Sequence, residues 1–92
     1  MREVILKVEP VELYKILKFE SMAPSGGVAK LAIESGDVFV NGEVETRKRK
    51  KIFAGDTVEF NGEQIRLVSV ANKDNVTTEY LYLSIIVDFR QR

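Results

Sequence analysis

The strongest candidate for a functional segment in this sequence is a stretch of five consecutive cations: Arg47, Lys48, Arg49, Lys50 and Lys51. We call this segment the basic run. A lysine or arginine that neutralises a phosphate releases a condensed counterion, so the run predicts salt-sensitive binding of a polyanion. The formal net charge is zero, with 14 basic and 14 acidic residues, and removing the run leaves 9 basic residues against 14 acidic ones. We therefore expect one concentrated positive patch on a mildly acidic body.

The basic run also has a purely structural interpretation. Charged side chains on an edge strand prevent the edge-to-edge aggregation of sheets, and the run taken alone fits this role as well as it fits binding. Successive side chains of a strand point to opposite faces, so Arg47, Arg49 and Lys51 would share one face if the run is a strand. The meaning of the run therefore depends on its surroundings.

A second candidate is the segment Ser25-Gly26-Gly27, which stands where a helix is expected to begin. Unpaired N–H groups and the positive end of the helix dipole can bind a phosphate there, and glycine lets a nucleic-acid backbone approach closely. Taken alone, the segment is better explained as an ordinary helix cap with a flexible entry. It is not a Walker-type nucleotide loop, because no Gly-Lys-Ser or Gly-Lys-Thr follows it.

Single lysines and aromatic residues are weaker candidates. Taken one at a time, each lysine is a solvated side chain or a member of a weak ion pair, and only clustering with the basic run would give it a function. These lysines are Lys15, Lys18 and Lys30. Aromatic rings can stack on bases, although we expect core packing for at least two of the three candidates. These rings belong to Tyr14, Phe39 and Phe53.

Two short helices in a helix-turn-helix-like pair are predicted to position several of these residues. The first runs from about Pro10 to Phe19, because proline suits the first helical turn and an apolar stripe follows at helical spacing. That stripe consists of Leu13, Ile16 and Leu17. The second helix has Ser25 as its N-cap and closes at Gly36 as a left-handed residue. Its apolar stripe consists of Val28, Ala29, Ala32 and Ile33.

Short strands and tight turns account for the rest of the chain up to residue 70. An apolar run predicts a strand over Glu3 to Val8. Two Asn-Gly pairs predict two hairpins, because both residues of that turn need positive φ. The predicted hairpin strands are 37–40 with 43–46 and 57–60 with 64–70, and a turn at 54–56 separates them. We therefore expect an α+β fold in which the helices pack on a small, mostly antiparallel sheet.

Residues 1–70 are expected to form the binding domain, and residues 71–92 a C-terminal extension. The segment from Val76 to Phe89 is rich in β-branched and aromatic residues, which favours a strand over an amphipathic helix. Tyr80 to Phe89 would then be able to add a strand to a second molecule. A monomer is the simpler expectation.

Several functional classes are disfavoured by the residue types that the sequence lacks. It contains no histidine and no cysteine, so the preferred zinc ligands and the commonest acid–base group are missing. The carboxylates are scattered, and we expect no enzymatic activity, no metal and no cofactor. The longest apolar run, Ile85-Ile86-Val87, cannot span a membrane, and no signal peptide is recognisable, so we expect a cytoplasmic location.

The order of these parts resembles the S-four-type RNA-binding domain over about Glu12 to Val68. The resemblance rests on Ser25-Gly26-Gly27 in a second helix, Gly36 to Gly42, the basic run, and Ala54 to Val58. More narrowly, the chain looks like free-standing bacterial ribosome-associated RNA-binding proteins. That likeness rests on Leu17-Lys18, Ala29-Lys30, Glu45 to Arg49, Lys51-Ile52 and Ala54-Gly55.

The resemblance implies that the helix pair and the adjoining hairpin present a basic surface to structured RNA. The positions that it implies are Lys18, Ser25, Gly26, Gly27, Lys30 and Arg47 to Lys51. Two cations common in the family are missing: Glu12-Leu13-Tyr14 stands where Arg-Leu-Asp is frequent, and glycine stands near an arginine position early in the second helix.

We therefore predict binding of structured RNA, with ribosomal RNA first among the candidates, through phosphate contacts and shape. Little base readout is expected, because an A-form helix hides its major-groove edges. The expected partner is a ribosomal subunit or a pre-ribosomal particle. The alternative is a protein-interaction module whose basic loop docks on an acidic surface, and the residues leave this choice open.

Overall fold

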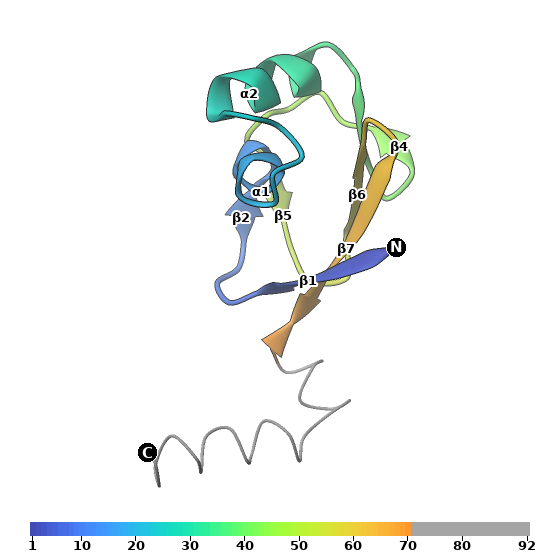
Figure 1. Ribbon diagram of the computed structural model, residues 1–92. Helices are drawn as coiled ribbons and strands as arrows, with labels where there is room; N and C mark the ends of the chain where they lie inside the picture. The colour runs from blue at the N-terminus through green and yellow to red at the C-terminus, as the bar shows by residue number, and fades with distance from the viewer. Residues whose placement is uncertain (71–92) are drawn as a thin grey trace, which may run out of the picture.

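The computed structural model describes residues 1–70, which form two helices and seven strands (Figure 1). The elements are β1 (Arg2–Leu6), β2 (Val11–Glu12), α1 (Leu13–Phe19), α2 (Gly26–Glu34), β3 (Val38–Val40), β4 (Glu43–Val44), β5 (Lys51–Ile52), β6 (Thr57–Phe60) and β7 (Glu63–Ser69). The predicted extension over residues 71–92, with its strand, lies outside the described residues. The predicted α+β fold is confirmed. Among residues 1–70, no helix is long and apolar enough to cross a membrane.

Five strands form one mixed sheet in the order β1-β7-β6-β3-β4, and β2 pairs with β5 in a separate two-stranded sheet. The β3–β4 and β6–β7 pairs are antiparallel, as predicted for the two hairpins, and β3 also pairs antiparallel with β6. The N-terminal strand β1 runs parallel to β7, with Leu6 opposite Ser69. The return strand of the first hairpin ends at Val44, so it is shorter than the predicted segment 43–46.

Both predicted hairpin turns are confirmed by their backbone angles. In each Asn-Gly pair, φ is 54° at the asparagine and 83–85° at the glycine. Such turns match the right-handed twist of the flanking strands. The predicted turn at 54–56 is also present, because φ is 100° at Gly55 and the Asp56 carboxylate accepts a 2.9 Å hydrogen bond from the Phe53 N–H.

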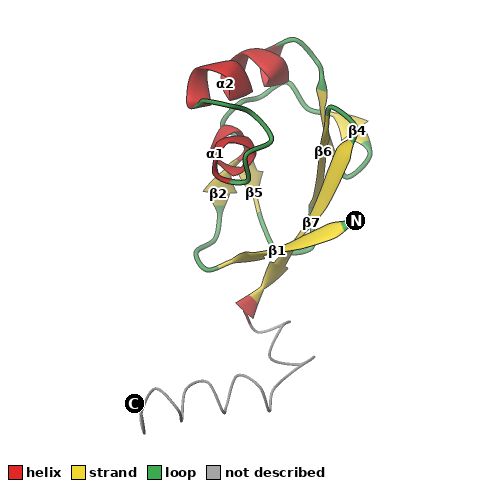
Figure 2. Cartoon of the chain, in the orientation of Figure 1, coloured by secondary structure: helices red, strands yellow, loops and turns green. Residues whose placement is uncertain are grey.

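The hydrophobic core lies between the helix pair and the large sheet (Figure 2). Its largest fully buried side chains are Leu13, Leu17, Ile33, Val38, Ile52, Val58, Ile65 and Leu67. The stripe predicted for the first helix is confirmed, since Ile16 is buried beside the two leucines. For the second helix, the prediction is wrong at Val28, which is 43% exposed because it lies in the first turn at the edge of the buried face.

The first helix begins at Leu13, so the predicted start at Pro10 is wrong. The two residues before Leu13 are extended and form β2, which pairs with β5. Glu12 is the N-cap residue, but its side chain makes no capping hydrogen bond. The first N–H groups of a helix need acceptors from elsewhere, and a distant segment supplies them here. A tertiary contact therefore sets the start of α1.

The second helix has the caps that the sequence predicts. The Ser25 hydroxyl oxygen accepts a hydrogen bond from the Val28 N–H at 3.2 Å, which confirms the N-cap. At the other end, Gly36 has a φ of 84°, and its N–H donates to the Ile33 carbonyl at 3.0 Å. Left-handed backbone at this position suits glycine and reverses the chain into β3.

Candidate nucleic-acid interface

The basic run is a loop rather than a strand. The Lys50 N–H donates to the Arg47 carbonyl at 3.1 Å and closes a turn, and only Lys51 belongs to a strand. The expectation that Arg47, Arg49 and Lys51 share one face of a strand is therefore wrong. The physical reason is that the run connects β4 to β5, which belong to different sheets, so the backbone must turn between them.

The backbone of the basic run is bonded to the N-terminus of α1. The N–H groups of Leu13 and Tyr14 donate to the carbonyl oxygens of Lys50 and Lys48, at 2.9 and 3.1 Å. These N–H groups belong to the first helical turn and have no partner within the helix. The carbonyl dipoles also offset the positive end of α1, which lies beside several cations. The formation of α1 and the placement of the run are therefore coupled.

Three cations of the basic run are paired with carboxylates. The pairs and their N···O distances are Arg47 with Glu45 at 2.8 Å, Lys48 with Glu34 at 2.6 Å, and Arg49 with Glu12 at 3.2 Å. The side-chain hydrogen bond from Arg47 lowers the pKa of the Glu45 carboxyl, against the opposing effect of partial burial. Among the described residues, no carboxylate lies within ion-pair distance of four candidate cations, namely Lys18, Lys30, Lys50 and Lys51.

Tyr14 lies where α1, α2 and the basic run meet. Its ring centroid is 4.6 Å from the Nζ of Lys30, 5.3 Å from the Cζ of Arg49 and 5.9 Å from the Nζ of Lys15. A cation within about 6 Å of an aromatic centroid is attracted by the ring quadrupole. Gly26, at the start of α2, lies against the same ring, since a Cβ there would be 3.9 Å from it. Three segments of the chain thus converge on one side chain.

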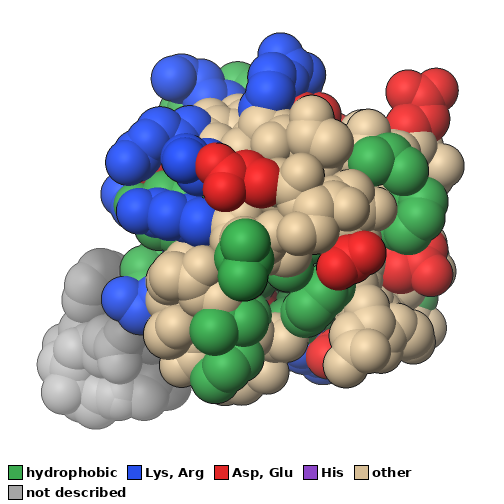
Figure 3. Space-filling view, turned by 90° about the horizontal axis from the view of Figure 1, so that it is seen from above, with side chains coloured by type: hydrophobic (Ala, Val, Ile, Leu, Met, Phe, Trp, Pro, Cys, Tyr) green, Lys and Arg blue, Asp and Glu red, His purple; other side chains and the backbone are tan. Residues whose placement is uncertain are grey.

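The predicted cations form one surface, which we call the basic face: Lys15, Lys18, Lys30 and the basic run. Figure 3 shows lysine and arginine side chains gathered on one side of the molecule. A hollow of about 400 Å³ in this face is lined by Arg47, Arg49, Lys50 and Lys51. Lys18 also belongs to this surface, because its Cδ lies 3.8 Å from the position of a Cβ on Gly26.

The start of α2 has an open backbone. Neither Gly26 nor Gly27 has positive φ, so the backbone conformation does not require glycine at these positions. A Cβ on Gly27 would meet only the Ser25 Oγ, at 3.9 Å. The Ser25 hydroxyl already accepts the capping hydrogen bond. The two glycines therefore leave space for a ligand backbone without being needed by the fold.

Sequence reasoning missed the carboxylate partners and the central position of Tyr14. Two of the three carboxylates lie 14 and 37 residues from their cations along the chain, so no local spacing marks them. Glu45 and Arg47 are two residues apart, and this pair had a local signal. The signal at Tyr14 was its position outside the apolar stripe of α1, next to Lys15.

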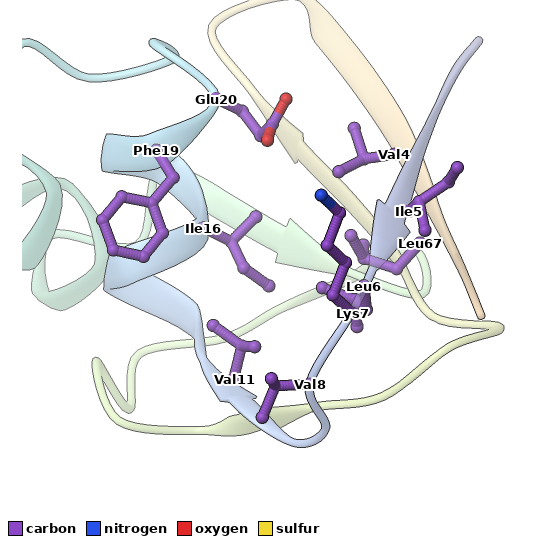
Figure 4. Close-up of a pocket in the computed structure, with 10 residues that line it drawn as sticks. All are labelled: Val4, Ile5, Leu6, Lys7, Val8, Val11, Ile16, Phe19, Glu20 and Leu67. Carbon is purple, nitrogen blue, oxygen red and sulfur yellow. The ribbon is translucent and has the colours of Figure 1, made fainter. Parts of the chain in front are cut away.

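An apolar groove lies apart from the basic face, between α1 and β1 (Figure 4). Its cavity has a volume of about 300 Å³. The apolar side chains that line it are Val4, Ile5, Leu6, Val8, Val11, Ile16, Phe19 and Leu67. Lys7 and Glu20 contribute one charge of each sign, so the groove has no feature that favours a polyanion. None of the predicted site residues lines it.

Comparison with known proteins shows what this chain is similar to. Residues 4–68 match the S4 domain, and this match includes both helices and the basic run. The Escherichia coli (strain K12) protein YbcJ is 52% identical over 59 residues, which are 64% of this chain and 84% of YbcJ. The Bacillus subtilis (strain 168) protein named "Probable ribosome maturation protein RlbA" is 34% identical over 59 residues, which are 64% of this chain and 83% of that protein.

A solved structure resembles the described domain as well. It is the solution structure of YbcJ from E. coli, described as revealing an ALFAL motif involved in RNA-binding. The match has a TM-score of 0.58 and 49% sequence identity, and it covers 74% of this chain and 87% of the YbcJ chain. The predicted fold and the predicted family are both confirmed by these comparisons.

Proposed function

Because the chain belongs to the S4 domain family, we propose that it binds structured RNA through the basic face, with ribosomal RNA as the first candidate. The observation that carries this proposal is the convergence of cations from α1, α2 and the basic run at Tyr14. A protein with zero formal net charge has no general attraction for polyanions, so a local concentration of cations must supply it. The motif described for YbcJ supports RNA as the polyanion.

In this proposal, phosphates bind first at the cations that have no carboxylate partner within residues 1–70. Lys50 and Lys51 line the hollow of the basic face together with two arginines, and each cation that neutralises a phosphate releases a counterion. The N–H groups at the start of α2 hold one further phosphate, beside Ser25, Gly26 and Gly27. Base readout contributes little, because the base edges of A-form RNA lie in a deep and narrow groove.

We further propose that the chain binds this RNA in the cytoplasm, on a ribosomal subunit or a pre-ribosomal particle. The name of the Bacillus subtilis relative, a ribosome maturation protein, supports this choice. The chain would act there as a monomer that binds RNA and catalyses no reaction. The chemistry of such a role is electrostatic and needs no cofactor.

A salt titration tests the proposed partner class. The full chain is titrated with a fragment of structured ribosomal RNA and, separately, with polyglutamate of matched charge. If about four phosphates are neutralised, the logarithm of the RNA affinity falls against the logarithm of the salt concentration with a slope of roughly −3 to −4. Equal or tighter binding of polyglutamate would instead make the basic face a docking site for an acidic protein surface.

A further inference from the structure

We propose that Tyr14 is a positioning residue for RNA binding. Its ring holds Lys30 of α2 and Arg49 of the basic run together, so that both cations meet the phosphates as a preformed pair. This inference rests on the proposed function and adds to it a residue that carries no charge. It assigns to Tyr14 a role in addition to its packing against the core and in place of base stacking, because cations already lie around its ring.

The contacts of Lys30 and Arg49 indicate this role. Among residues 1–70, no carboxylate lies within ion-pair distance of Lys30, and the ring of Tyr14 is 4.6 Å from its Nζ. Arg49 is shared between the same ring, 5.3 Å from its Cζ, and the Glu12 carboxylate. Two like charges repel each other, and the negative face of an aromatic ring reduces the cost of holding them close.

The ring is well placed to fix these two long side chains. Tyr14 is half-buried and packs against the hydrophobic core, and it follows Leu13, which is fully buried. The N–H of Tyr14 donates to the Lys48 carbonyl, so the basic run is tied to the same residue. Lysine and arginine lose conformational freedom when they bind a phosphate. A ring that orders them beforehand lowers this cost, which is the general advantage of preorganisation.

A comparison of two substitutions in the full chain tests this inference. Tyr14→Phe keeps the ring and should bind structured RNA within about twofold of the wild type, because a phenylalanine ring also attracts cations. Tyr14→Leu removes the ring and should lose roughly threefold to tenfold in affinity, as expected when the ordering of about one long side chain is no longer made before binding. The salt slope should stay the same in both variants, because the number of cations is unchanged.

A second background separates positioning from a general effect on the fold. Lys30→Gln with Arg49→Gln should make the salt slope shallower by roughly 2, since each phosphate contact contributes about 1. In this background, Tyr14→Leu should have no further effect on affinity.

Circular dichroism and thermal unfolding of each variant show whether the fold is retained. In the free protein, nuclear magnetic resonance should show side-chain protons of Lys30 shifted upfield by the ring, and this shift should vanish in Tyr14→Leu.

Three results would overturn the inference. They are RNA binding by Tyr14→Leu equal to that of the wild type, an equal loss in Tyr14→Phe, and a full Tyr14→Leu effect in the background without Lys30 and Arg49. A wild-type chain that binds no structured RNA would overturn the proposed function instead. The two failures are distinguishable, because the first set is seen only when the wild type binds.

Discussion

The backbone N–H of Tyr14 donates a 3.1 Å hydrogen bond to the carbonyl oxygen of Lys48, and this bond joins the first helix to the basic run. The N–H of the preceding residue, Leu13, makes the equivalent bond to Lys50 at 2.9 Å. The loop thus provides acceptors for the first turn of α1, while α1 fixes the loop. The cations of the basic run are therefore held by the folded domain, although the run itself has almost no regular structure.

Because the folded domain holds the basic run, we predict that replacing Ile52, which follows the run in β5, strongly destabilises the fold. Its side chain is fully buried, so Ile52→Ala should lower the free energy of unfolding by about 2–5 kcal/mol. Thermal unfolding measures this, with a fall of about 4–8 °C for each kcal/mol in a domain of this size. Leu31→Ala is the control, because Leu31 is 64% exposed and its loss should change stability by less than about 0.5 kcal/mol. Equal effects of the two substitutions would argue against the buried anchor.

The Glu34 carboxylate, which pairs with Lys48, should weaken RNA binding in the wild type. Glu34 lies 2.6 Å from the Lys48 Nζ and competes with a phosphate for the same cation. Glu34→Gln should raise RNA affinity by about twofold to fivefold, since an exposed ion pair contributes about 0.2–1 kcal/mol. Glu59→Gln changes the net charge equally but lies in β6, and fluorescence anisotropy should show a smaller gain for it. A gain of the same size in both variants would mean that only net charge matters.

The open backbone at the start of α2 predicts that stability and binding respond differently to one methyl group. Gly27→Ala should leave the thermal midpoint unchanged or raise it, because alanine is favoured over glycine in helices by about 0.5–1 kcal/mol and a Cβ fits there. RNA affinity should nevertheless fall if the RNA backbone approaches this turn closely. Unfolding and RNA titrations of the same preparation check both parts. Unchanged affinity would remove the start of α2 from the proposed site.

The ion pair between Glu45 and Arg47 predicts a defined pH dependence of stability. The side-chain hydrogen bond from Arg47 lowers the pKa of Glu45 in the folded state, and partial burial opposes this. A lowered folded-state pKa means that the contribution is fully present above the unfolded glutamate pKa of about 4.3 and is lost as the pH falls through the folded-state value. The difference in thermal midpoint between wild type and Glu45→Gln should thus be constant near neutral pH and shrink below about pH 4. A constant difference at all pH values would contradict the assignment.

Local signals in the sequence predicted much of the fold. The Asn-Gly turns, the Ser25 cap and the Gly36 cap were predicted correctly, because each depends on the conformation of a few adjacent residues. The start of α1 was predicted wrongly at Pro10, because its N–H acceptors come from the basic run, more than 30 residues further along the chain. The parallel pairing of β1 with β7 joins the two ends of the domain and has no local signal.

The candidate site was predictable in its residue types but not in its arrangement. The basic run was visible as a cluster of charge, and the resemblance to a known family added Lys18, Lys30 and the start of α2. Its conformation was not predictable from alternation, because the run is a loop between two sheets. The role proposed for Tyr14 depends on contacts with Lys30 and Arg49, which lie 16 and 35 positions away in the sequence. These contacts can therefore be seen only in the folded structure.

RNA binding at the basic face is tested most directly by comparing two pairs of cations in one salt series. Lys50→Ala with Lys51→Ala removes from the basic face two charges that have no ion-pair partner in the described part of the chain, and Lys7→Ala with Arg66→Ala removes two charges elsewhere on the domain. Binding of a structured ribosomal RNA fragment is measured for the wild type and both double variants. We expect weaker binding and a salt slope shallower by roughly 2 for the first pair, with a slope near that of the wild type for the second. Identical slopes for the two variants would contradict the claim that RNA binds at the basic face.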